Sequence, residues 1–128
     1  MAFKVELTVE GKTFVVRRYY AVIFREDDKK GRPKSDPAWR LYVVIDSLND
    51  TTITNWMLDP KKLVDGKLSL YKIGDGSKVK DIEFKKSSCT FLNDHFNIEQ
   101  PFITSYVAIS GKDIKINTAE LQQSWPGA

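Results

Sequence analysis

Residues 3–16 read FKVELTVEGKTFVV, and this stretch decides the fold class. In its first half, apolar residues alternate with polar ones, and the apolar positions are Phe3, Val5, Leu7 and Val9. Because successive side chains of a strand point to opposite faces, this period of two predicts a half-buried β-strand. Glu-Gly-Lys at 10–12 supplies a tight turn, and a run rich in β-formers follows up to Phe24. The stretch therefore predicts a β-hairpin.

The rest of the chain is also β-rich. Further strands are predicted at 39–46, 67–73, 79–92, 102–110 and 113–117. Within 79–92 the apolar positions change parity, which predicts a bulge between Lys85 and Ser88. Gly111-Lys112 reads as a turn between the last two strands. About seven short strands without βαβ alternation predict a barrel or a sandwich, folded as a single domain over residues 1–128.

One short helix is predicted at about residues 50–58. Asn49 or Asp50 can cap it, because a short polar side chain accepts the first free backbone N–H groups. Three apolar residues form one stripe at positions i, i+3 and i+4, namely Ile53, Trp56 and Met57. This stripe would pack the helix on the sheet. Pro60 follows, and the residue before a proline disfavours helix.

The segment from Arg25 to Ala38 is the longest polar stretch and is predicted to be a loop. It holds Gly31, Pro33 and Pro37 and lacks apolar periodicity. Its basic and acidic residues are interleaved, and the whole chain carries a formal charge of only +3, so no nucleic-acid partner is expected. Long loops in compact domains are often functional, which makes this segment a candidate interaction site.

Residues capable of catalysis or metal binding are scarce. Cys89 is the only cysteine and His95 the only histidine, so the sequence offers neither an internal disulfide nor a zinc-ligand pattern. A Cys–His nucleophile pair would lack any supporting motif. Cys89 is expected to be a buried strand residue and His95 a loop residue. No catalytic residue, cofactor site or metal site is predicted, and the chain is not expected to be an enzyme.

The distribution of apolar residues bears on localisation. The first twelve residues alternate apolar and charged positions, unlike the unbroken apolar run of a secretory signal. No window approaches the ~18 apolar residues that span a membrane. The chain is therefore expected to be synthesised in a reducing cytoplasm and not to insert into a membrane.

An ordered set of short matches runs through nearly the whole chain. It comprises Phe3-Lys4, 9–12, Gly31-Arg32-Pro33, Ser35, Asp50-Thr51, Trp56-Met57, 65–67, Tyr71-Lys72, 82–84, Ile109-Ser110, Glu120-Leu121 and Trp125. In this order the chain resembles the tube proteins of type VI secretion systems, the haemolysin-coregulated (Hcp, TssD) family, and within it a divergent short branch. The resemblance implies an antiparallel β-barrel with one helix on its flank.

The resemblance also implies a function. Such proteins form hexameric rings that stack head to tail into a tube, which carries or shelters effectors. Expected partners are further copies of the chain, sheath, spike and baseplate components, and effector proteins. After assembly in the cytoplasm the tube would be exported without a signal peptide. The contact between stacked rings would involve Gly31, Arg32, Pro33 and Ser35, and the helix residues would lie near the lumen side or the core.

One segment departs from the family pattern. After the loop serine, the chain reads Asp36-Pro37-Ala38-Trp39, where relatives carry small residues and glycines. Two prolines and a tryptophan would stiffen the base of the loop, which leaves open a specialised copy that forms rings but stacks poorly, or one dedicated to a particular cargo. Two alternatives to the type VI tube also stay open. One is the tail-tube protein of another contractile injection machine, and the other is a monomeric ligand-binding β-barrel.

Overall fold

The computed structural model describes residues 2–25, 29–31, 37–47, 50–117 and 119–122. The opening hairpin is confirmed: strand β1 (Phe3–Val9) pairs antiparallel with strand β2 (Lys12–Phe24). Glu10 and Gly11 form the two-residue turn with φ of 49° and 76°, and glycine adopts the second value without steric penalty. Alternate residues of both strands face the core, as the period of two requires.

Five more strands and one helix follow among the described residues. They are β3 (Ala38–Asp46), α1 (Thr52–Leu58), β4 (Val64–Lys72), β5 (Lys78–Asn97), β6 (Gln100–Ile116) and β7 (Ala119–Gln122). The sheet order is β3-β2-β1-β4-β5-β6-β7, and an additional pairing of β3 with β6 closes strands β1 to β6 into a barrel. The predicted mainly-β barrel with a short flanking helix is confirmed. Strand β7 pairs with the end of β6 and was not expected.

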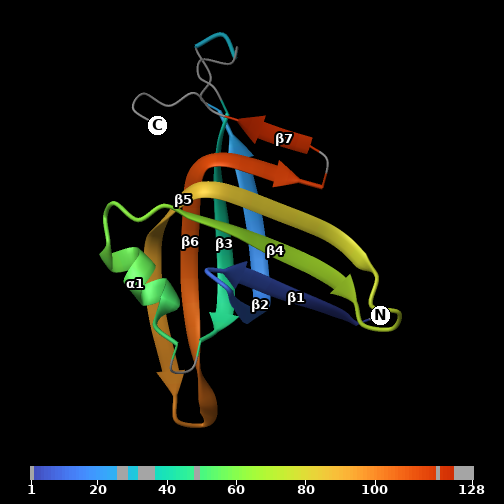
Figure 1. Cartoon of the computed structure of the whole chain (residues 1–128), viewed down its shortest axis with the longest axis vertical. Coiled ribbons are helices and arrows are strands. Elements are labelled where there is room, and N and C mark those ends of the chain that lie inside the picture. The colour runs from blue at the N-terminus through green and yellow to red at the C-terminus, as the bar shows by residue number, and fades with distance from the viewer. Residues whose placement is uncertain (1, 26–28, 32–36, 48–49, 118, 123–128) are drawn as a thin grey trace.

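Two long strands connect two layers of the barrel. In Figure 1, β1, β4 and the first part of β5 cross in front of β2, β3, the first part of β6 and the second part of β5, and the last part of β6 runs beside the first part of β5. Strand β5 changes layer at a bulge, where its register against β4 shifts between Phe84 and Ser87 and Lys86 adopts a φ of 50°. The predicted bulge is confirmed, and it lets residues on both sides of it face the core.

The predicted turn at Gly111-Lys112 is wrong. Both residues lie inside β6, which runs without interruption through its bend. Glycine is needed there because a Cβ on Gly111 would lie 2.7 Å from the Cα of Ser87 on the neighbouring strand. The close approach of two backbones, rather than a chain reversal, explains this glycine.

The core lies between the two layers and is centred on aromatic side chains. Trp56 of α1 stacks on Phe84 of β5, with ring centroids 6.2 Å apart, and its indole Nε1 donates a hydrogen bond to the Ser87 carbonyl oxygen at 3.1 Å. Trp39 contacts the same phenylalanine, also at 6.2 Å. Trp39 is therefore a buried residue of β3, so this part of the segment that departs from the family pattern serves the core.

The helix begins after Asp50, whose carboxylate accepts a hydrogen bond from the Thr52 backbone N–H at 2.7 Å. Hydrogen bonds from Thr52 hold the pKa of Asp50 below its ordinary value. Asn49, the alternative capping residue, lies outside the described residues. None of the helices among the described residues is long and apolar enough to cross a membrane.

Candidate functional site

One layer of the barrel extends past the ends of β1 and β4, the two strands that pair with its sides. Strand β1 pairs with β2 only as far as Val16, and β4 pairs with β5 only as far as Ser87. Past these points, β2, β3, β6 and β5 form a four-stranded sheet. Its two inner strands, β3 and β6, each pair with a strand on both sides. Within the described residues, no strand pairs with the far side of β2 after Val16 or of β5 after Ser87. The sheet thus has an open edge on each side.

The two open edges are complementary in direction. Each of the three pairings, β2–β3, β3–β6 and β6–β5, is antiparallel. Strand β5 therefore runs opposite to β2 at the other side of the sheet. An open edge presents unpaired backbone N–H and C=O groups and is a template for pairing with another chain. Edge β2 of one copy and edge β5 of another can thus extend one antiparallel sheet.

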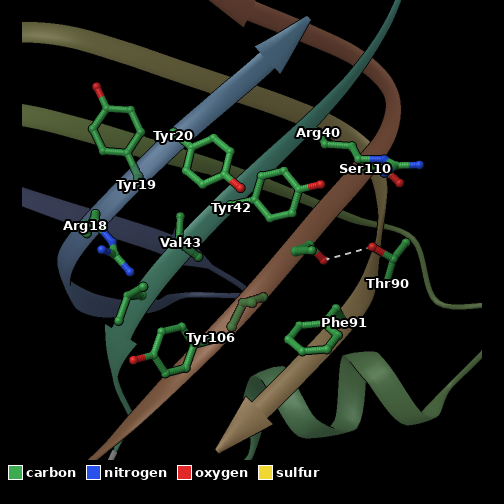
Figure 2. A pocket seen from close by; sticks show the side chains of 13 residues that line it. Arg18, Tyr19, Tyr20, Arg40, Tyr42, Val43, Thr90, Phe91, Tyr106 and Ser110 are labelled. Atoms are coloured by element: carbon green, nitrogen blue, oxygen red, sulfur yellow. Dashed lines mark hydrogen bonds between the residues drawn. The ribbon is translucent and has the colours of Figure 1, made fainter. Parts of the chain in front are cut away.

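A groove of about 550 Å³ lies on the side of this sheet that faces away from the core, and we call this side the groove face (Figure 2). One row across the four strands contains Tyr20, Tyr42, Ala108 and Phe91, which are paired in register. The rings of Tyr20 and Tyr42 are stacked, with centroids 4.6 Å apart and planes inclined by 20°. Tyr20 is 56% exposed and Phe91 52%, so the row is an open aromatic surface.

The charged residues of the groove are basic. Arg40 lies one row to one side of the aromatic row and Arg18 one row to the other, and Figure 2 shows both beside the tyrosines. Among the described residues, those lining the groove include no carboxylate. Near its margin, Arg17 forms an ion pair with Asp46 at 2.7 Å, and the hydrogen bond to this carboxylate raises the pKa of Arg17.

One of the four residues predicted for ring stacking is among the described residues. Gly31 is exposed and has a φ of 79°, a conformation that favours glycine. Arg32, Pro33 and Ser35 lie outside the described residues. Of the predicted helix-packing residues, Ile53 and Trp56 are 3% and 2% exposed, whereas Met57 is 37% exposed at the margin of the stripe.

Cys89 and His95 both lie on β5 but on different sides of it. Cys89 is buried against the core, and His95 is an exposed strand residue rather than the expected loop residue. Burial raises the pKa of the Cys89 thiol to about 11, which opposes formation of the nucleophilic thiolate. Within the described residues, no three His, Cys, Asp or Glu side chains gather as metal ligands would.

The state of Cys89 is testable by alkylation. Its raised pKa implies about a hundredfold less thiolate at neutral pH than an ordinary thiol with a pKa of 9.0, and burial also blocks access. We expect iodoacetamide to leave Cys89 unmodified in the native protein while modifying it in urea, as measured by mass spectrometry. Equal rates in both states would show that the thiol is accessible and reactive.

Sequence reasoning missed the groove face, although its residues are visible in the sequence. The signal was the apolar and aromatic character of both faces of 19–24 and 39–45, which exceeds what a half-buried strand requires. Which of these side chains share a row depends on the register of four strands, and the sequence does not specify that register. No local pattern indicates the open edges either, because they follow from where pairing stops.

The fold has several solved counterparts. Hcp1 from Flavobacterium johnsoniae superposes with a TM-score of 0.82 and 22% identity, covering 94% of this chain and 99% of that chain. Hcp1 from Salmonella typhimurium gives 0.72 at 12% identity, covering 94% and 92%. A chain of the sheath-tube complex of PVC, an extracellular contractile injection system, gives 0.61 at 10%, covering 91% and 89%. At these identities the similarity establishes the fold.

Sequence comparison establishes the family. No curated protein sequence matches the chain significantly. The family model described as hemolysin coregulated protein Hcp (TssD), however, matches residues 1–126, which is nearly the whole chain. Sequence, barrel topology and flanking helix agree, and the chain belongs to the Hcp (TssD) family.

Proposed function

We propose that this protein is a structural subunit of a type VI secretion tube, in which six copies close into a ring and rings stack head to tail. The observation that carries the proposal is the pair of open edges on opposite sides of one four-stranded sheet. Family membership supports a tube protein, and it gives no support for an enzyme.

The edges fit a ring in particular. Joining edge β2 of one copy to edge β5 of the next is a heterologous contact, because the two surfaces differ. Such contacts close into a ring when the rotation between copies divides a full turn. Strand directions also alternate across each junction, so the result is one continuous antiparallel barrel. A pair of copies joined by a single such contact would still have one unpaired β2 edge and one unpaired β5 edge.

The shape of the subunit decides which face points inward. Strands β1 and β4 and helix α1 lie on the core side of the sheet, opposite the groove face (Figure 1). Copies joined edge to edge around an axis have more room at a larger radius. The thick side of each subunit therefore faces outward, and the groove face lines the lumen.

The remaining partners follow from the family resemblance. The loop with Gly31, Arg32, Pro33 and Ser35 would contact the next ring, while the outside of the tube would meet sheath components. Spike, baseplate and effector proteins would complete the machine, and the tube would be exported without a signal peptide. The tail tube of another contractile injection machine is the second candidate, since a chain of the PVC sheath-tube complex shares the fold.

Two single substitutions on the open edge of β2 test the ring contact. Successive residues of an antiparallel strand direct their N–H groups to opposite sides. Of Ala21→Pro and Val22→Pro, one therefore removes a donor from the open edge and the other removes one from the β2–β3 ladder. We expect one variant to stay folded with the mass of a single subunit, and the other to lose its fold, as measured by circular dichroism and light scattering.

If both variants stay folded and both keep the wild-type ring mass, the β2 edge is not the contact. If neither folds, hydrogen exchange of the wild-type protein decides instead. Backbone amides of residues 17–24 and 91–96 should exchange more slowly in concentrated protein than after dilution to single subunits. Equal exchange in both segments at both concentrations would contradict pairing at these edges.

A further inference from the structure

We propose that the groove face binds acidic polypeptide segments that also carry aromatic side chains, and that these segments belong to the cargo of the tube. The proposal rests on the ring described above, which turns the groove face toward the lumen. It specifies the chemistry of the partner, which neither the fold nor the family match provides.

Charge complementarity is the first argument. Arg18 and Arg40 flank the aromatic row, and neither forms an ion pair with a carboxylate of the described residues. On the groove face of these four strands, Asp46 is the only carboxylate among the described residues, and it is engaged by Arg17. A partner with carboxylates would supply the missing acceptors, because a guanidinium binds a carboxylate with two parallel hydrogen bonds.

The aromatic row is the second argument. Tyr20 and Phe91 of the row are 56% and 52% exposed, and Tyr106 of the neighbouring row is 39% exposed, which leaves ring surface for a partner to cover. Such surface favours flat, apolar side chains, since offset aromatic stacking adds to the burial of area. Arg40 already lies over the Phe24 ring, with its Cζ 5.7 Å from the centroid. A stacked guanidinium loses little freedom when it binds a carboxylate.

Single-stranded nucleic acid also combines aromatic surfaces with negative charge. Proteins that bind it follow the backbone with a positively charged groove, and each neutralised phosphate adds to the affinity. Among the residues that the structure describes, two arginines line this groove, and the chain as a whole has a formal charge of +3. Two cations beside a broad aromatic row fit scattered carboxylates better than a continuous phosphate backbone. The observations therefore favour an acidic polypeptide.

Binding can be measured with defined polymers. A dye-labelled random copolymer of glutamate and tyrosine is titrated with the full-length protein, and fluorescence anisotropy gives Kd. We expect saturable binding that weakens as salt increases, with no binding of the copolymer of lysine and tyrosine. The double variant Arg18→Gln/Arg40→Gln should weaken Kd by about tenfold or more, because two charge-assisted contacts are lost.

The matched control is Lys61→Gln/Lys72→Gln. It removes the same charge from two exposed positions away from the groove, one after α1 and one at the end of β4. It should leave Kd unchanged within about twofold. Tyr42→Ser should also weaken Kd, because it removes the ring that stacks on Tyr20. If the control variant weakens Kd as much as the arginine variant does, the loss reflects net charge alone, and the proposal is overturned. Equally tight binding of an oligothymidine with the same arginine dependence would replace the peptide by nucleic acid and also overturn it.

Light scattering on the same samples separates this proposal from the ring. A ring that does not bind the glutamate–tyrosine copolymer would overturn the cargo proposal and leave the tube proposal intact. A single subunit that binds the copolymer through both arginines would overturn the ring and support a peptide-binding groove. A ring whose double variant keeps its mass but loses binding is the result that we expect.

Discussion

Trp56→Ala should lower the free energy of unfolding by about 3–5 kcal/mol, the usual loss for removing a buried aromatic side chain. Trp56 is 2% exposed and stacks on Phe84 in the centre of the barrel. Its truncation leaves a cavity and removes the hydrogen bond from the indole to the Ser87 carbonyl oxygen. Urea denaturation followed by circular dichroism measures the change.

The neighbouring Met57 provides the control on the same short helix. It is 37% exposed, so Met57→Ala should cost about 1 kcal/mol or less. The contrast isolates burial in the core from any general weakening of α1. Similar losses for both variants would mean that the helix does not anchor the barrel through Trp56.

Gly111→Ala should lower the free energy of unfolding by about 3 kcal/mol, although it adds only one methyl group. The new Cβ would lie 2.7 Å from the Cα of Ser87, which belongs to the backbone and cannot rotate away. Strands β5 and β6 would have to separate where both bend between the layers. The midpoint of urea denaturation reports this loss.

Gly74→Ala is the matched substitution, because a Cβ there would meet no atom within 4 Å. Its stability should change by no more than about 0.5 kcal/mol. A tolerated Gly111→Ala would show that β6 turns at this glycine, as its sequence alone predicts, and that the two strands do not approach closely.

The sequence predicted the elements that depend on local patterns. The alternation in residues 3–16 identified the first hairpin, and the parity change between Phe84 and Cys89 located the bulge of β5. These features follow from side-chain direction, which repeats every two residues in a strand. The short helix was also predicted, because its apolar stripe and the following proline are local signals.

Features that depend on distant contacts were missed. Gly111 was assigned to a turn, because glycine followed by lysine gives the same local signal whether the chain reverses or two backbones approach closely. The polar end of β5, from Asn93 to Asn97, looks like a loop and is a strand only because it pairs with β6. The groove face depends on register across β2, β3, β6 and β5, so no single segment encodes it.

The solution mass of the purified protein tests the central claim most directly. Light scattering at several protein concentrations and salt levels should give a mass close to six times the 14.7 kDa of one chain. A closed assembly is predicted because a ring pairs every β2 edge with a β5 edge and leaves none open. The number of six copies follows from the family resemblance. A mass of 14.7 kDa that persists at high concentration would contradict the ring, and with it the account of the open edges.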